Sequence, residues 1–222
     1  MPLLAVDLSP QGTASLKRYA GVAFYLQADG LLATCKHIIQ SLEPGETLVA
    51  KNLLTGDTER LIDTRCHPTA DFALCRTLSP TTHDYFRHLD IEPALGTDVQ
   101  ALGFTAAGAE GRNLVVESRL FKGYISMSGK HPARPDARST LAVSFPSLRV
   151  FRVAPVICGS GSALVGMLYS NLESTIELFK YEEVKDGAHR FSESVHRVLE
   201  SGLVQPISDI RSFVDELGVT LQ

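Results

Sequence analysis

The stretch CGSGSALV, residues 158–165, places Ser160 between two glycines immediately before an apolar run. Two other signals lie upstream: ATCKHII puts His37 at the end of an apolar segment, and DFAL puts Asp71 at the start of another. A serine hydroxyl is a poor nucleophile until a neighbouring base takes its proton, and that base needs an acid group to hold its tautomer. Ser160, His37 and Asp71 therefore form a candidate nucleophilic triad.

Each of these signals is weak when it is taken alone. A single histidine after an apolar segment usually has a structural role, an aspartate before a strand usually belongs to a turn, and a Gly-Ser repeat is usually a flexible loop. The three occur in the order His, Asp, Ser, with gaps of 34 residues (71 − 37) and 89 residues (160 − 71). Taken together, the three signals favour one shared site. No role is predicted for the histidines that lack such context, among them His67, His83 and His131.

The motifs resemble those of the chymotrypsin-fold serine proteases, in the style of the bacterial high-temperature-requirement type. TCKH at 34–37 stands where that family has TAAH, and DFAL stands for its DIAL. GSGSA at 159–163 stands for the family's nucleophile motif, an Asp or Asn followed by SGGP or SGSP. Two stretches outside the triad also agree, GTDVQALGF at 96–104 and FKGYIS at 121–126. The resemblance covers roughly residues 19–215.

This resemblance implies an all-β fold of two six-stranded antiparallel β-barrels, with the active site between them and a C-terminal helix. Residues 1–222 would form a single trypsin-like domain, with the N-terminal barrel at roughly 1–95 and the C-terminal barrel and helix at 96–222. The implied activity is that of a serine endopeptidase with a restricted protein substrate. His37 would be the general base, Asp71 its orienting acid and Ser160 the nucleophile. No cofactor or metal is expected.

The resemblance also implies an oxyanion hole made by the backbone N–H groups of Cys158 and Ser160, with Gly159 between them. The family usually has glycine where this chain has Cys158, and an acid or amide where it has Gly159. We therefore expect an incomplete hole in the free chain, with slow cleavage of generic peptides until a substrate or partner orders the Cys158 peptide. The loss of one such donor costs on the order of 100- to 1,000-fold in turnover. Activation by a newly freed N-terminus is not expected.

The substrate pocket implied by the resemblance has Ala154 at its floor and Tyr169, Ser170 and Asn171 along its wall. None of these residues carries an acid that could bind a Lys or Arg side chain. We therefore expect small or neutral apolar side chains before the scissile bond.

Two alternatives to a serine endopeptidase stay open at this point. A binding or scaffold protein could keep the barrels without turnover, and Cys158 in place of the family's glycine is the main reason to consider it. A cysteine peptidase could instead use Cys158, as viral relatives of the fold do. The residues after Ser160 match the serine motif better than those after Cys158 match a cysteine motif, so the sequence favours Ser160.

Composition bounds the setting of the protein. The chain has 222 residues, 44% of them hydrophobic, which is enough to bury a substantial core. Its formal charge of −4 provides no basic field for nucleic acid, and no apolar run approaches the ~20 residues of a membrane span. The first residues lack the pattern of a signal peptide, so a cytoplasmic setting with reduced thiols is expected. The expected partner is a protein or peptide substrate, and an activating protein stays open. The four cysteines show no paired metal-ligand spacing: 35, 66, 75 and 158.

Short strands separated by turn residues predict a β-barrel or sandwich. Residues 28–30 predict a hairpin turn between the first two of these strands, and 126–139 predicts a polar surface loop. The predicted strands lie at 19–26, 31–34, 47–54, 60–64, 72–77, 98–104, 114–125, 148–154, 162–170 and 175–180.

Two helices are predicted near the C-terminal end. Phe191, Val195, Val198 and Leu199 recur at the spacing of one helix face, which predicts a helix that ends near Gly202. A last helix is predicted from an N-cap at Ser208 to a stop at Gly218. Its inward side chains are expected to be Ile210, Phe213, Val214 and Leu217.

Overall fold

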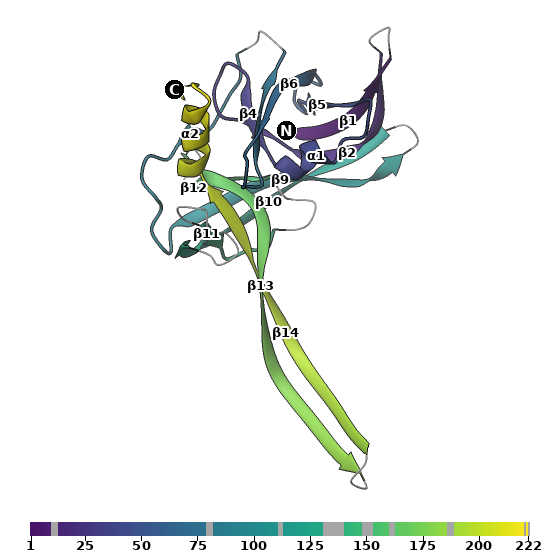
Figure 1. Cartoon of the computed structure of the whole chain (residues 1–222), viewed down its shortest axis with the longest axis vertical. Coiled ribbons are helices and arrows are strands. Elements are labelled where there is room, and N and C mark those ends of the chain that lie inside the picture. Colours follow the sequence, from purple (N-terminus) through teal and green to yellow (C-terminus); the bar gives the residue numbers. More distant parts are fainter. Residues whose placement is uncertain are drawn as a thin grey trace.

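The protein is mostly β-structure, arranged in two sheets, with a helix near its C-terminal end (Figure 1). The first sheet is a half-barrel and the second forms a ring. This confirms the expected all-β class and the terminal helix. No helix in the described residues is long and apolar enough to cross a membrane. The computed structural model describes residues 1–9, 13–78, 82–110, 113–130, 140–147, 153–159, 163–185, 189–219 and 221.

Seven strands of the described chain form the first sheet, in the order β2-β1-β5-β6-β7-β4-β3, with antiparallel neighbours throughout. Their bounds are β1 Pro2–Leu8, β2 Ala14–Val22, β3 Phe24–Tyr25, β4 Leu31–Thr34, β5 Glu46–Lys51, β6 Thr58–Cys66 and β7 Ala73–Thr77. The hairpin predicted at 28–30 is confirmed, because β3 pairs with β4 and the Leu26 N–H donates to Leu31 O across the turn (2.8 Å). The sequence pattern did not reveal β1.

The two ends of the first sheet come from neighbouring parts of the chain. β2 and β3 stand at opposite ends of the strand order, yet only Ala23 separates them in sequence. The Ala23 N–H donates to Met1 O (2.9 Å). One bent segment, 14–25, therefore contributes to both ends of the half-barrel.

The second sheet, again counted over the described residues, has the order β12-β9-β10-β11-β14-β13-β8. β12 also pairs with β13, and this pairing closes six antiparallel strands into a ring. β8 pairs with β13 in parallel and lies outside the ring. The bounds are β8 Arg87–His88, β9 Asp98–Glu110, β10 Asn113–Gly129, β11 Thr140–Val143, β12 Pro155–Cys158, β13 Ala163–Lys185 and β14 His189–Pro206. The polar loop predicted at 126–139 is wrong for its first residues, because β10 continues to Gly129. Residues 131–139 lie outside the described part.

β13 and β14 continue beyond the ring as a long two-stranded ribbon that projects from the rest of the protein (Figure 1). We call residues 172–185 and 189–201 the arm. The helix predicted up to Gly202 is therefore wrong, because those residues form β14. Phe191, Val195 and Leu199 also fit one face of a strand, so their spacing does not separate the two structures. Pairing with β13 along the whole arm decides the outcome.

The buried apolar residues gather in two clusters. The larger one joins the first sheet to the terminal helix α2, Ile207–Glu216, and to the near side of the ring. The smaller one fills the ring. In α2, the inward positions Ile210, Phe213 and Val214 are buried as predicted, whereas Leu217 is 41% exposed. The helix begins two residues earlier than expected, with Pro206 rather than Ser208 at its N-cap.

Candidate active site

His37 lies on α1, Lys36–Gln40, a short helix that follows β4 directly. The next residue, Ile38, is buried against β2 at Gly21. A Cβ at Gly21 would lie 2.3 Å from the Ile38 Cδ1 atom, which is closer than real contacts allow. A glycine within an apolar strand often marks such a close approach. Gly21 therefore allows α1 to lie on β2, and this sets the position of His37.

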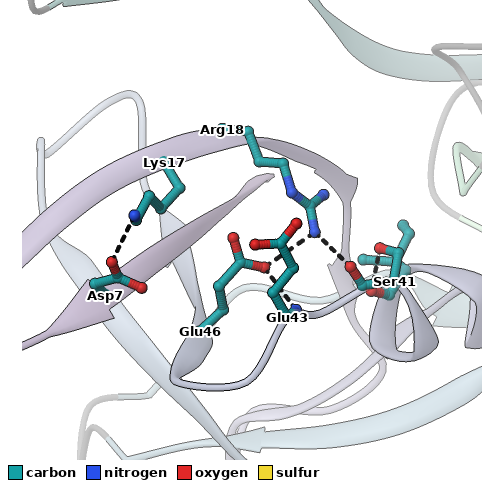
Figure 2. Close-up of polar contacts among 7 residues, drawn as sticks. Asp7, Lys17, Arg18, Ser41, Glu43 and Glu46 are labelled. Atoms are coloured by element: carbon teal, nitrogen blue, oxygen red, sulfur yellow. Dashed lines mark hydrogen bonds and ion pairs between the residues drawn. The ribbon is translucent and has the colours of Figure 1, made fainter.

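A partly buried ion pair holds the other end of α1 (Figure 2). Arg18, on β2, donates to Ser41 O (2.7 Å) and to the Glu46 carboxylate (3.1 Å). The Glu46 side chain is only 4% exposed, and it also accepts the N–H of Glu43 (3.0 Å). The Ser41 N–H in turn donates to His37 O (3.0 Å). This network ties the helix that carries His37 to two strands of the first sheet.

Asp71 is presented by the connection between β6 and β7, and Lys36 anchors that connection. The Lys36 ammonium donates to His67 O (2.9 Å) and to Pro68 O (3.0 Å). The residue before His37 therefore holds the backbone that leads to Asp71.

His67 stabilises the same connection from within. Its N–H donates to Phe72 O (3.0 Å), and its Nδ1 accepts the Ala70 N–H (2.8 Å). Its ring packs on Phe72 and on Phe213 of α2, at 4.7 and 4.9 Å between centroids. No role was predicted for His67, and the structure shows that it shapes the turn that carries Asp71.

Asp71 holds His37 through both of its carboxylate oxygens. Oδ2 lies 2.7 Å from His37 Nδ1, and Oδ1 accepts the backbone N–H of His37 (3.0 Å). A carboxylate can only accept hydrogen bonds, so Nδ1 carries the proton in the contact, and the neutral tautomer selected in this way has its lone pair on Nε2. The His37 side chain is 42% exposed and that of Asp71 is 34% exposed. The pair therefore orients an accessible imidazole as a general base must be oriented.

Cys35 completes a group of three side chains that could in principle bind a metal. The ligand atoms of Cys35, His37 and Asp71 lie within 4.8 Å of one another, and Cys35 is fully buried. The 2.7 Å between His37 Nδ1 and Asp71 Oδ2 is a charge-assisted hydrogen-bond distance. Two ligands of a tetrahedral zinc ion would stand roughly 3.3 Å apart, given the usual bond lengths. The distance between His37 and Asp71 therefore fits a hydrogen bond, and zinc binding would require these two side chains to move apart.

The predicted nucleophile, Ser160, lies outside the described residues, and the structure describes its neighbours on either side. Cys158 is half-buried and pairs in register with Val99 of β9 and Ala163 of β13. The Gly159 N–H donates to Asp98 O (3.2 Å), and Gly159 has a left-handed backbone with φ of 56°. The N–H of Gly159 is therefore used within the ring.

The residues predicted to form the substrate pocket lie together on the ring. Ala154 is fully buried, and its O accepts the N–H of Leu168, the residue before Tyr169 (2.9 Å). Tyr169 is buried, while Ser170 is half-buried and pairs with β14 where the arm begins.

Asn171 is engaged at the base of the arm. Its Oδ1 accepts the Ser147 N–H, and its Nδ2 donates to the Glu200 carboxylate (3.3 Å). The structure thus brings His37 to Asp71, and Ala154 to the strand of Tyr169, Ser170 and Asn171.

The sequence did not single out several residues that support the site. Gly21, Arg18 and Lys36 each position α1 or its neighbouring connection. Only Gly21 had a readable signal, as a glycine inside an apolar strand. The partners of Arg18 and Lys36 are 23 to 32 residues away in sequence, so no local pattern could reveal them.

Comparison of the sequence with protein-family models and with curated proteins finds no match. The function is therefore inferred from the geometry around His37 and Asp71, together with the resemblance of the motifs.

Proposed function

We propose that the chain is a serine endopeptidase of the chymotrypsin type, in which His37 and Asp71 activate Ser160. The observation that carries this proposal is the double contact of Asp71 with His37, at 2.7 Å to Nδ1 and 3.0 Å from the backbone N–H. The first contact sets the tautomer and the second sets the position of the base. Residues that are 34 apart in sequence meet as the motif resemblance requires.

The sheet topology supports the two-barrel fold that belongs to this proposal. Only Ala23 separates β2 from β3, so if the two are counted as one bent strand, the half-barrel has the six strands that the proposed first barrel needs. The ring that β12 and β13 close would correspond to the second barrel. Sharp bends of this kind are common where a strand turns the corner of a barrel.

In the proposed reaction, His37 Nε2 takes the proton of the Ser160 hydroxyl while Oγ attacks the peptide carbonyl carbon. Asp71 stabilises the imidazolium that forms. His37 then gives this proton to the leaving amine as the C–N bond breaks, which leaves an acyl-enzyme. Water repeats the sequence and releases the acid, so the triad returns to its starting state.

The remaining groups keep the roles that the resemblance implies. The N–H groups of Cys158 and Ser160 hold the oxyanion, and Ala154 with the strand of Tyr169 receives an uncharged side chain. The pairing of Cys158 with two strands limits how its peptide can turn. This supports slow turnover of generic peptides by the isolated chain.

Labelling with a fluorophosphonate probe, followed by mapping of the modified residue, tests this function. The expected result is a label on Ser160 that is absent from Ser160→Ala and His37→Ala and retained in Cys158→Ser. A label or acylation on Cys158, with an active Ser160→Ala variant and an inactive Cys158→Ser variant, would instead establish a cysteine nucleophile.

A second candidate function is a protease-fold binding protein without turnover, and one observation favours it. Cys158 and Ala163, on either side of Ser160, pair with each other, and Gly159 is bonded to Asp98 at the start of β9. This end of β12 packs on the ring cluster, whereas Cys35 beside His37 belongs to the other cluster. Such a protein would fail to react with the probe while binding peptide segments with His37 and Asp71 intact.

A further inference from the structure

The arm exposes a large amount of apolar side chain. Large apolar residues on both of its strands are between 40 and 61% exposed. Monomeric proteins rarely leave such residues in a contiguous group without a function. They are Ile176, Leu178, Phe179, Tyr181, Val195, Val198 and Leu199.

The strand register shows that most of these residues share one face. Residues that pair across an antiparallel ribbon point to the same side, and successive pairs alternate between the sides. One face therefore receives the pairs Leu172–Ser201, Ser174–Leu199 and Ile176–Arg197. A register shift between Glu177 and Phe179 inserts Leu178, and the same face then continues with the Phe179–Val195 pair and with Tyr181.

The opposite face is polar. It receives Glu173 paired with Glu200, and Glu177 paired with His196. Two carboxylates that stand directly opposite each other repel unless water surrounds them. Val198 is the exception on this face, at 55% exposed. The arm is therefore an amphipathic ribbon, with its acidic face suited to solvent and its apolar face uncovered by the residues that the structure describes.

An isolated two-stranded ribbon is marginal in water, because it lacks a second layer against which to bury side chains. The ring cannot supply that layer, since the contact of β14 with β11 ends at Gly202 and the arm begins at the next pair. With no such layer among the described residues, the cover is supplied by another molecule that presents an apolar surface of similar length.

We propose that the apolar face of the arm binds the same face of a second copy of this chain, so that two arms form a small two-layer sandwich. From Leu172 to Tyr181 the stripe is ~30 Å long and about two strands wide. Two such stripes bury on the order of 1,000 Å² in total, which is the size of a weak, reversible interface. A two-fold axis makes one self-complementary patch sufficient, and the acidic faces remain in water.

The position of Arg197 favours a second copy of this chain over a different protein as the partner of the arm. It is the one cation on the apolar face among the side chains that the structure describes. A two-fold axis that runs across the strands, between the Ile176–Arg197 and Phe179–Val195 pairs, places each Arg197 over Val195 of the second copy. Phe179 of that copy lies one strand away, within reach of the long Arg197 side chain. A guanidinium over an aromatic ring is attractive, and arginine is enriched in interfaces. The interface is independent of His37 and Asp71.

Two valines on β14 provide a matched test. Val195 and Val198 are of the same type, three residues apart and similarly exposed, at 49 and 55%, but they lie on opposite faces. Sedimentation velocity of the purified chain from about 1 to 100 μM should show a reversible dimer. Val195→Ser should raise the dimer Kd about tenfold and Phe179→Ser about 100-fold, whereas Val198→Ser should leave it unchanged.

Far-UV circular dichroism of each variant checks that the fold is retained, which is expected because the substituted side chains are exposed. The proposal is overturned if the wild-type chain stays monomeric over this range, as it would if the arm bound a different protein. It is also overturned if Val198→Ser weakens the dimer as much as Val195→Ser does.

Discussion

The His37–Asp71 pair and the arm are held in the molecule by opposite kinds of contact. The pair is supported by residues that are distant in sequence, such as Arg18 and Lys36, and each support comes from another element. The arm is held by pairing between its two strands, and within the described part of the chain nothing packs on its apolar face.

This difference separates two uses of apolar sequence. Beneath the site, Ile38 and Phe72 are buried and their packing sets the position of a polar group. On the arm, Phe179 and Val195 are exposed, and their apolar surface is available to another molecule. Substitutions near the site should therefore change stability or chemistry, and substitutions on the arm should change association.

The largest expected effect is at Asp71. In Asp71→Asn, the side-chain oxygen can still accept one N–H of His37. Either the new NH₂ group then faces Nδ1, or the imidazole adopts the wrong tautomer. In triads of this type, such a change lowers kcat by on the order of 10⁴. The rate constant of fluorophosphonate labelling should fall by a comparable factor, while the melting temperature changes little. Equal labelling of the variant and the wild type would remove Asp71 from the mechanism.

The next effect compares two phenylalanines. Phe72 is fully buried and packs on Phe213 of α2, with ring centroids 5.4 Å apart. Phe72→Ala should lower the free energy of unfolding by about 3 to 5 kcal/mol. Phe179→Ala should change it by less than about 0.5 kcal/mol when measured below the dimer Kd. Urea unfolding at one low protein concentration measures both, and a large loss for Phe179→Ala would mean that the arm is covered within the monomer.

A smaller effect is expected at Gly21. A Cβ there would collide with Ile38 Cδ1, so Gly21→Ala should cost about 1 to 3 kcal/mol and displace α1. Ile38→Val removes the Cδ1 atom and should recover part of this loss in the double variant. A double-mutant cycle in urea measures the coupling. Strictly additive losses would show that the contact between Gly21 and Ile38 does not position the helix.

The smallest effect concerns pH. Burial lowers the pKa of His88, and the nearby Arg211 guanidinium lowers it further. The folded state then binds fewer protons than the unfolded state, so stability increases with pH in this range. The stability that the folded state gains from a neutral His88 is therefore lost as the pH falls below about 6.5, the usual histidine pKa. His88→Gln should reduce the loss of stability between pH 7 and pH 5 relative to the wild type, and an unchanged difference would contradict the assignment.

Local patterns were sufficient for parts of the fold. The glycine turn at 28–30 and the apolar runs around it predicted the β3–β4 hairpin, and the spacing of Ile210, Phe213 and Val214 predicted α2. The motifs around His37 and Asp71 predicted that these residues would meet, and they do. In each case the signal lies within a few residues, or in a motif that the whole site requires.

Where the sequence-based predictions failed, contacts between residues distant in sequence decided the structure. Val195 and Leu199 fit a helix face and a strand face equally well, and pairing with β13 decided between them. β1 went unrecognised because its place depends on β2 and β5, on both of its sides. The supports of the site, Arg18 and Lys36, depend on the three-dimensional fold in the same way.

The closure of the ring also bears on how quickly the chain can fold. Ala101 of β9 pairs with Val156 of β12, which are 55 residues apart (156 − 101), and Leu141 pairs with Val204, which are 63 apart (204 − 141). The strands of the arm, in contrast, can zip from Lys185–His189, which are four residues apart (189 − 185). Contacts between residues that are distant in sequence have the larger entropic cost of loop closure. Such contacts slow two-state folding to milliseconds or seconds. The arm therefore can form early, and its apolar face is exposed to other chains while the ring is still open.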